Sequence, residues 1–118
     1  MKRTITYERK IDIGYIYVIP GLKRLKINET IELDTNECIN VDIDHNHRIV
    51  GLELFAEEAD VLHHTPVQDD MYSLRFTEQN ILSTYHFSGV DFHFSKPDHE
   101  GFIGFDIVDQ LKYKALLK

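Results

Sequence analysis

The sequence predicts an α+β fold that is mainly antiparallel β, built as two related β-meander or hairpin units with one or two short helices. Three observations predict it. Apolar and polar residues alternate along most of the chain, as in strands with one buried face. The alternating runs are about four to eight residues long, and turn-forming residues separate them. Similar motifs also recur in the two halves of the chain.

The first half of the chain contains five predicted strands. Pro20 ends the second of them, because proline cannot donate to a β-ladder. The segment 21–27 that follows suits either a loop or a strand. The predicted strands are 4–8, 12–20, 30–34, 38–44 and 48–55.

A short helix is predicted at residues 56–64, directly after the fifth strand. Phe55, Ala59 and Leu62 share one face at helical spacing, and Pro66 stops the helix.

The second half repeats this plan, with strands at 70–76, 81–89, 90–94 and 102–108. The last two strands form a hairpin, and Gly101 is a turn residue between them. Residues 109–117 alternate as in a strand, but they occupy the place of the first-half helix. A short helix with Asp109 as its N-cap is therefore favoured.

The parallel between the halves predicts a tandem duplication within a single domain, 1–118, with repeats at about 5–62 and 67–117. The alternative is that any two amphipathic hairpins resemble each other. We favour duplication because the shared order runs through several elements, and it predicts a pseudo-twofold relation between the halves. The corresponding positions are Gly51 with Gly104, Glu53 with Asp106, and Val41-Asp42 with Val90-Asp91.

The net charge of −7 disfavours nucleic acid and anionic membranes as partners and favours a basic protein. The alternative is that the charge serves solubility alone. No apolar run is long enough to span a bilayer, and no signal peptide is recognisable, so the expected compartment is the cytoplasm. Cys38 is the only cysteine, which excludes an internal disulfide and favours a packed core thiol.

Two stretches carry a motif that resembles a known family. The first is a strand with Asp12, Tyr15 and Ile16, and the second lies within 41–54. Together they resemble the small bacterial family called domain of unknown function 2283, over about residues 5–56. The family has glycine where this chain has His47. The resemblance implies a small β-rich domain and no known activity. The residues that match in the second stretch are Val41, Asp42, Asp44, Gly51, Leu52, Glu53 and Leu54.

The segment 42–53 also resembles a calcium-binding loop, with acidic or amide side chains at the required spacing. His47 replaces the glycine that such a loop needs, and both flanks alternate as strands do. A hairpin is therefore favoured. Asp44 starts its turn, and Asn46 or His47 takes the left-handed conformation.

A metal site is the alternative use of the histidines. His86 and His93 could face each other across a hairpin, with Asp91 on the same face as His93. The structural interpretation is that these are the polar faces of half-buried strands. No phosphate-binding loop, dinucleotide motif or nucleophile elbow is present, so no cofactor is predicted.

These observations favour a non-enzymatic protein-interaction module with an acidic surface, for example an immunity-type inhibitor of a basic partner. The alternative is a small-ligand or metal-binding protein that uses the histidine and carboxylate faces. An enzyme would need a cleft with shifted acid or base groups. Exposed edge strands also favour a homodimer. The candidate partner-binding residues are Glu57, Glu58, Asp60, Asp69 and Asp70.

Overall fold

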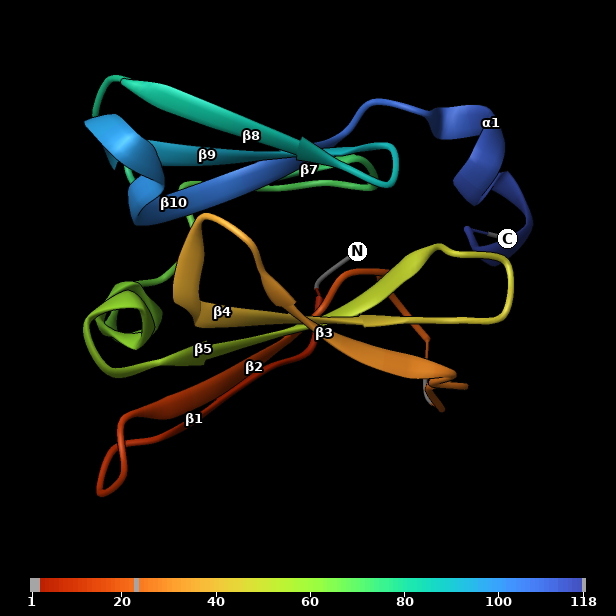
Figure 1. Ribbon diagram of the computed structural model, residues 1–118, viewed down its shortest axis with the longest axis horizontal. Coiled ribbons are helices and arrows are strands. Elements are labelled where there is room, and N and C mark those ends of the chain that lie inside the picture. The colour runs from red at the N-terminus through yellow and green to blue at the C-terminus, as the bar shows by residue number, and fades with distance from the viewer. Residues whose placement is uncertain (1–2, 23, 118) are drawn as a thin grey trace.

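Two antiparallel sheets of five strands each form the two layers of the molecule (Figure 1), which confirms the predicted β-rich, two-unit fold class. The computed structural model describes residues 3–22 and 24–117. The N-terminal sheet has the strand order β1-β2-β5-β4-β3. Its strands are β1 (Ile5–Glu8), β2 (Ile13–Tyr17), β3 (Glu29–Leu33), β4 (Asn36–Ile43) and β5 (Ile49–Phe55).

The C-terminal sheet has the order β6-β7-β10-β9-β8. In each half, the strand that comes last in the sequence lies in the centre of its sheet. This shared order is what the predicted tandem duplication requires, and the duplication itself stays a prediction. The strands are β6 (Gln68–Asp69), β7 (Ser73–Arg75), β8 (Ser83–Phe87), β9 (Val90–Lys96) and β10 (Glu100–Ile107).

Most strand boundaries differ from the sequence predictions by one to three residues, and β2 ends at Tyr17, before Pro20. The predicted strand 70–76 is extended as β7 only over its last part, and the short strand β6 precedes it. The described residues of segment 21–27 form no strand.

The inner faces of the two sheets form the hydrophobic core. Alternation places every second side chain of a central strand on this face, where it meets its cross-strand partners. Fully burying one such side chain contributes about 1.5–3 kcal/mol. The fully buried cross-strand neighbours are Ile16, Leu52 and Val41 in one sheet and Leu74, Phe105 and Phe92 in the other.

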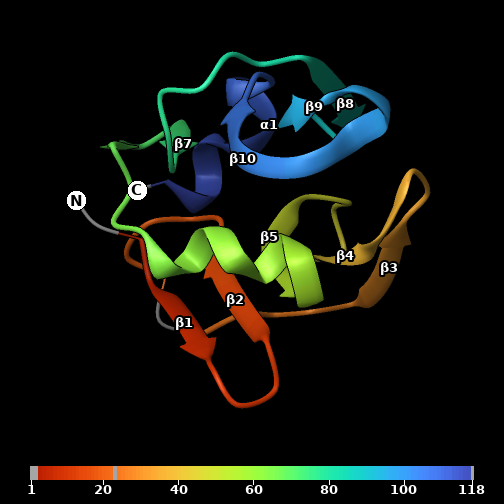
Figure 2. The same cartoon turned by 90° about the vertical axis from the view of Figure 1, so that its left-hand side faces the viewer.

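Helical segments lie at opposite ends of the two layers (Figure 1), and Figure 2 looks onto the end that carries η1 (Ala56–His63). This segment confirms the predicted position of the first helix, but it is a 3₁₀ helix. The short segment η2 (Pro97–His99) joins β9 to β10, and α1 (Gln110–Tyr113) with η3 (Lys114–Leu116) ends the described chain. None of these helices is long and apolar enough to cross a membrane.

The helix α1 forms hydrogen bonds with residues of both halves of the chain. The carboxylate of Asp109 accepts the N–H of Lys112 at 3.1 Å, which confirms the predicted N-cap. The Tyr113 hydroxyl donates to the carbonyl of Ser88 and accepts the N–H of Ile49, both at 2.8 Å. Burial raises the pKa of Tyr113 to about 12, so this hydroxyl keeps its proton at neutral pH.

The segment that resembles a calcium loop is the turn of the β4–β5 hairpin, as predicted. One oxygen of Asp44 accepts the N–H groups of Asn46 and Arg48, both at 2.9 Å. Its other oxygen pairs with the Nε of Arg48 at 2.8 Å. His47 takes the left-handed conformation, with φ of 59°. Gly101 also has a positive φ, of 75°, but it is the second residue of β10, so η2 and not Gly101 forms the turn between β9 and β10.

The Asp44 turn predicts a pH-dependent loss of stability. Burial acts to raise the pKa of the Asp44 carboxyl, but the hydrogen bonds from Arg48 and Asn46 outweigh burial and lower it. The folded chain therefore releases this proton more readily than the unfolded chain, whose carboxyl titrates near about 3.9. The stabilisation by ionised Asp44 is complete above the unfolded-state pKa. It disappears as the pH falls through the lower pKa that Asp44 has in the folded chain.

We therefore expect Asp44→Asn to lower the free energy of unfolding by about 1–2 kcal/mol at pH 7 and by clearly less at pH 2. Urea unfolding at both pH values measures the difference. An equal loss at the two pH values would contradict the ionic role of Asp44.

Candidate functional site

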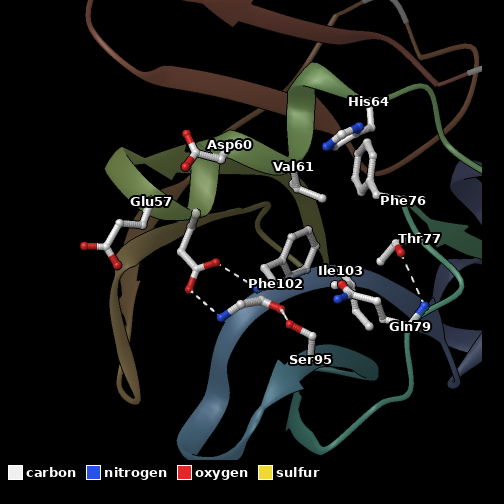
Figure 3. A pocket seen from close by; sticks show the side chains of 12 residues that line it. Glu57, Asp60, Val61, His64, Phe76, Thr77, Gln79, Ser95, Phe102 and Ile103 are labelled. Carbon is white, nitrogen blue, oxygen red and sulfur yellow. Dashed lines mark hydrogen bonds between the residues drawn. The ribbon is translucent and has the colours of Figure 1, made fainter.

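A pocket of about 300 Å³ lies between η1 and the C-terminal sheet (Figure 3). We call it the η1 pocket. Its floor is apolar and comes from Val61 of η1 with Phe76, Phe102 and Ile103 of the facing segments. Polar side chains surround this floor. They are Glu57, Glu58, Asp60, His64, Thr77, Gln79 and Ser95, together with the backbone of Gly101.

A second pocket, of about 490 Å³, adjoins the first and shares Glu57 and Glu58 with it. We call it the acidic pocket. It lies beside the turn between β3 and β4, and no lysine or arginine is among the described residues that line it. Its lining residues are Glu32, Asp34, Thr35, Asn36, Glu37, Cys38, Glu57, Glu58 and Glu100.

Cys38 lines the acidic pocket and is half-buried, which corrects the expectation of a core thiol. The reason is that Cys38 lies on β4 one residue before the fully buried Ile39, so its side chain takes the opposite face. Burial, followed by the negative charges of Glu58 and Glu37, raises the pKa of the thiol. The sulfur is therefore protonated at neutral pH and is a poor nucleophile.

Glu58 has a structural role that its neighbours on η1 lack. The residue is only 7% exposed. Its carboxylate accepts the N–H of Phe102 at 2.7 Å, the N–H of Gly101 at 3.0 Å and the Nδ2 of Asn36 at 2.7 Å. Asn36 begins β4 and the other two residues belong to β10, so Glu58 ties the two sheets together beneath η1. Of the predicted partner-binding acids on this helix, Glu57 and Asp60 are the exposed ones.

Asp69 and Asp70 lie apart from these pockets and bind Arg3 instead. The carboxylate of Asp69 pairs with Nη1 of Arg3 at 2.8 Å, and the carbonyl of Asp70 accepts from the same nitrogen. The carboxylate of Asp70 accepts the N–H groups of Tyr72 and Ser73 within its own turn. The structure thus divides the predicted acidic set into three: Glu57 and Asp60 are exposed on η1, Glu58 is buried beneath it, and Asp69 and Asp70 hold a buried arginine.

The predicted metal residues do not assemble into one site. His86 pairs with Asp91 through Nδ1 at 2.6 Å. Both nitrogens of His93 are used elsewhere, by Thr84 at 3.0 Å and by Asp106 at 2.9 Å. Across residues 3–22 and 24–117, no three histidine, cysteine or acidic side chains are grouped so as to hold a metal ion.

The outer face of the N-terminal sheet carries a hydrogen-bonded group that the sequence did not single out as a unit. The Tyr15 hydroxyl donates to Asp42 at 2.6 Å, and the Thr30 hydroxyl donates to the other oxygen of the same carboxylate. Gly51 lies beneath this contact. A larger residue would not fit there, because its Cβ would come within 1.7 Å of the Tyr15 oxygen. Burial, followed by the hydrogen bond to Asp42, raises the pKa of Tyr15, so its hydroxyl acts as a donor.

The C-terminal sheet carries a related arrangement on its outer face. Gly104 of β10 is paired with His93 of β9, as Gly51 of β5 is paired with Asp42 of β4. By register, Asp42 therefore corresponds to His93, and not to Asp91 as in the comparison of the two sequences. The chain between His93 and Gly104 is longer than the chain between Asp42 and Gly51. Aligning the two sequences on Val41-Asp42 and Val90-Asp91 therefore places the second hairpin out of its structural register.

Comparison with known proteins identifies relatives of unknown function. The profile of the family described as protein of unknown function (DUF2283) matches residues 4–56. The uncharacterized protein YuzE of Bacillus subtilis (strain 168) is 32% identical over 124 aligned residues, which cover 98% of this chain and 95% of that relative. No solved structure matches the chain.

Proposed function

The chain belongs to the DUF2283 family of proteins of unknown function, and we propose that it is a non-enzymatic protein-interaction module that binds a basic partner through an acidic surface. An immunity-type inhibitor of a basic protein is one example of such a module.

The observation that carries this proposal is the gathering of exposed acids around the η1 pocket and the acidic pocket. Glu57 and Asp60 project from η1, and acids of the β3–β4 turn and of β10 stand beside them. Because this surface combines one sign of charge with hollows, it concentrates negative potential and would attract a cationic protein from solution. The additional acids are Glu32, Asp34, Glu37 and Glu100.

The apolar floor of the η1 pocket adds a second feature of protein interfaces. Val61 is half-exposed there, above the buried rings of Phe76 and Phe102. A lysine or arginine of the partner could lay its aliphatic stem on this floor while its charged end meets Glu57 or Asp60. An apolar centre with a polar rim is the usual composition of a specific interface.

The experiment is an NMR titration of the whole chain with hexa-arginine peptide as the probe. We expect amide shifts concentrated in η1 and the β3–β4 turn, and much weaker binding at about 0.5 M salt, because salt screens exposed charges. The variant Glu57→Lys/Asp60→Lys should bind at least about tenfold more weakly, since two attractive contacts become repulsive.

Glu8→Lys/Glu29→Lys is the matched control, because it changes the net charge equally at two exposed positions outside both pockets. We expect it to weaken binding by less than about threefold, because its charges lie outside the contact and salt screens them from the probe. Equal weakening by the two double variants, or shifts spread evenly over the chain, would count against a defined acidic binding surface.

A further inference from the structure

A third pocket, of about 390 Å³, differs in charge from the rest of the molecule. It lies at the end of the layers opposite η1, where the β4–β5 turn and the C-terminal helices come together (Figure 1). Basic residues gather here, although the chain as a whole carries a net charge of −7. We call it the basic pocket. Its lining residues are Leu22, Arg24, Lys26, Asp44, His45, Asn46, Arg48, Val50 and Leu116.

Arg24 and Lys26 are exposed, and within the described residues neither forms an ion pair. Their charges are therefore available to a ligand. Arg48 uses only its Nε in the pair with Asp44, and no other described residue accepts from its Nη atoms.

Among the described residues that line the basic pocket, Asp44 is the only one with a carboxylate, and that carboxylate is already bonded within the protein. Its oxygens accept two backbone N–H groups and the Nε of Arg48. Because Asp44 offsets the charge of Arg48, it is Arg24 and Lys26 that leave the pocket positive.

Part of the lining of the basic pocket is apolar. Leu22 and Leu116 are half-buried, and Val50 is buried behind them. Most small-molecule sites combine such an apolar wall with a few converging polar groups, and their volumes begin near about 300 Å³.

We propose that the basic pocket binds a small anion with an apolar tail, in which a carboxylate or phosphate head meets Arg24, Lys26 and Arg48 and the tail lies against Leu22 and Leu116. This site is separate from the acidic surface and selects a ligand of opposite charge. Arginine and lysine donors suit such a head, because hydrogen bonds between ionised groups are the strong ones.

The test uses four probes with the native chain, followed by NMR amide shifts. Octanoate and octyl phosphate have the proposed head and tail. Octyltrimethylammonium has the same tail and the opposite charge, and inorganic phosphate has a head without a tail. We expect saturable binding of octanoate or octyl phosphate, with shifts at His45, Arg48 and Leu116. Neither of the other probes should saturate in the same range.

The variant Arg24→Glu/Lys26→Glu should weaken binding of the anionic probe at least about tenfold, because each charged contact is worth that much or more. Arg9→Glu/Lys10→Glu is the matched control, since it makes the same charge change at exposed positions outside the basic pocket. We expect the control to bind within about twofold of the native chain, because its changed charges make no contact with the probe. Thermal melting checks that both variants are folded, and Arg24→Gln/Lys26→Gln provides a milder version.

Three outcomes would overturn the proposal. One is the absence of saturable binding by both anionic probes. Another is equal weakening by the two double variants, which would indicate a general charge effect. The third is co-sedimentation with phosphatidylglycerol vesicles without binding of the free anionic probes, which would assign the basic residues to a lipid surface.

Discussion

Replacing Arg3 with methionine should lower the free energy of unfolding by about 3–5 kcal/mol, because it removes one partner of a buried ion pair. The side chain of Arg3 has no exposed surface, and it pairs with Asp69 at 2.8 Å. Its guanidinium also donates to the carbonyls of Val18 at 2.9 Å, Met71 at 3.0 Å and Ser73 at 3.2 Å. Methionine fills much of the same space but leaves these acceptors without a donor.

The effect is large because Arg3 joins the two sheets. Val18 follows β2 in the N-terminal sheet, whereas Asp69 and Ser73 belong to strands of the C-terminal sheet. The guanidinium also lies 5.0 Å from the ring centre of Phe105, in the core strand β10. One side chain thus satisfies acceptors in both layers.

Urea unfolding at pH 7 measures the loss. Arg9→Met is the matched control, since Arg9 is exposed in the β1–β2 turn, and we expect a change within about 0.5 kcal/mol. A loss below about 1 kcal/mol for Arg3→Met would mean that the buried pair contributes little. Asp69→Asn should lose less than Arg3→Met, because the carbonyl contacts of Arg3 remain.

Glu58→Ala should lower the free energy of unfolding by about 2–4 kcal/mol. The change removes the acceptor of two backbone N–H groups, on Gly101 and Phe102, and of the Asn36 amide. Each buried donor left unsatisfied costs about 1–3 kcal/mol. Partial access of water near Gly101, which is half-exposed, keeps the total below the full sum.

Glu57→Ala is the natural comparison, because Glu57 precedes Glu58 on η1 and is exposed. We expect it to change stability by less than about 0.5 kcal/mol. The two variants should therefore separate folding from binding: Glu58→Ala destabilises, whereas Glu57→Ala weakens contact with a basic probe. Similar losses of stability in the two variants would contradict the structural role of Glu58.

The strands were predictable because their cause is local. In a strand with one buried face, apolar and polar residues alternate whatever the strand packs against. The alternation therefore predicts β4 and β5 from the sequence alone. The turn between them was equally local, since Asp44 caps N–H groups only two and four residues away. Asp109 is a further case, because its N-cap contact spans three residues.

The functions of single acids could not be predicted in the same way. Glu57 and Glu58 are adjacent and chemically identical, yet one is exposed and the other is buried under η1. What distinguishes them is β10, which lies more than forty residues further along the chain. The same holds for Arg3 and Asp69, whose contact depends on the packing of the two sheets. The 3₁₀ form of η1 was also not predictable, because over eight residues a period of 3.0 resembles one of 3.6.

The basic pocket escaped the sequence analysis for a related reason. Arg24, Arg48 and Leu116 come from three distant segments. The stretch KRLK at 23–26 is basic in the sequence, but nothing in the sequence shows that it meets the other two segments. Only the packing of the C-terminal helices against the β4–β5 turn gathers them.

The position of β5 and β10 in the middle of their sheets has a consequence for synthesis on the ribosome. The hairpins β1–β2 and β3–β4 leave the exit tunnel first, but they cannot join until Ile49–Phe55 emerges and pairs with both. Until then, a nascent chain displays the unpaired sides of β2 and β4, which are templates for intermolecular pairing. The second half passes through the same vulnerable interval before β10 appears, so chains stalled just short of either strand should be the ones that aggregate or recruit chaperones.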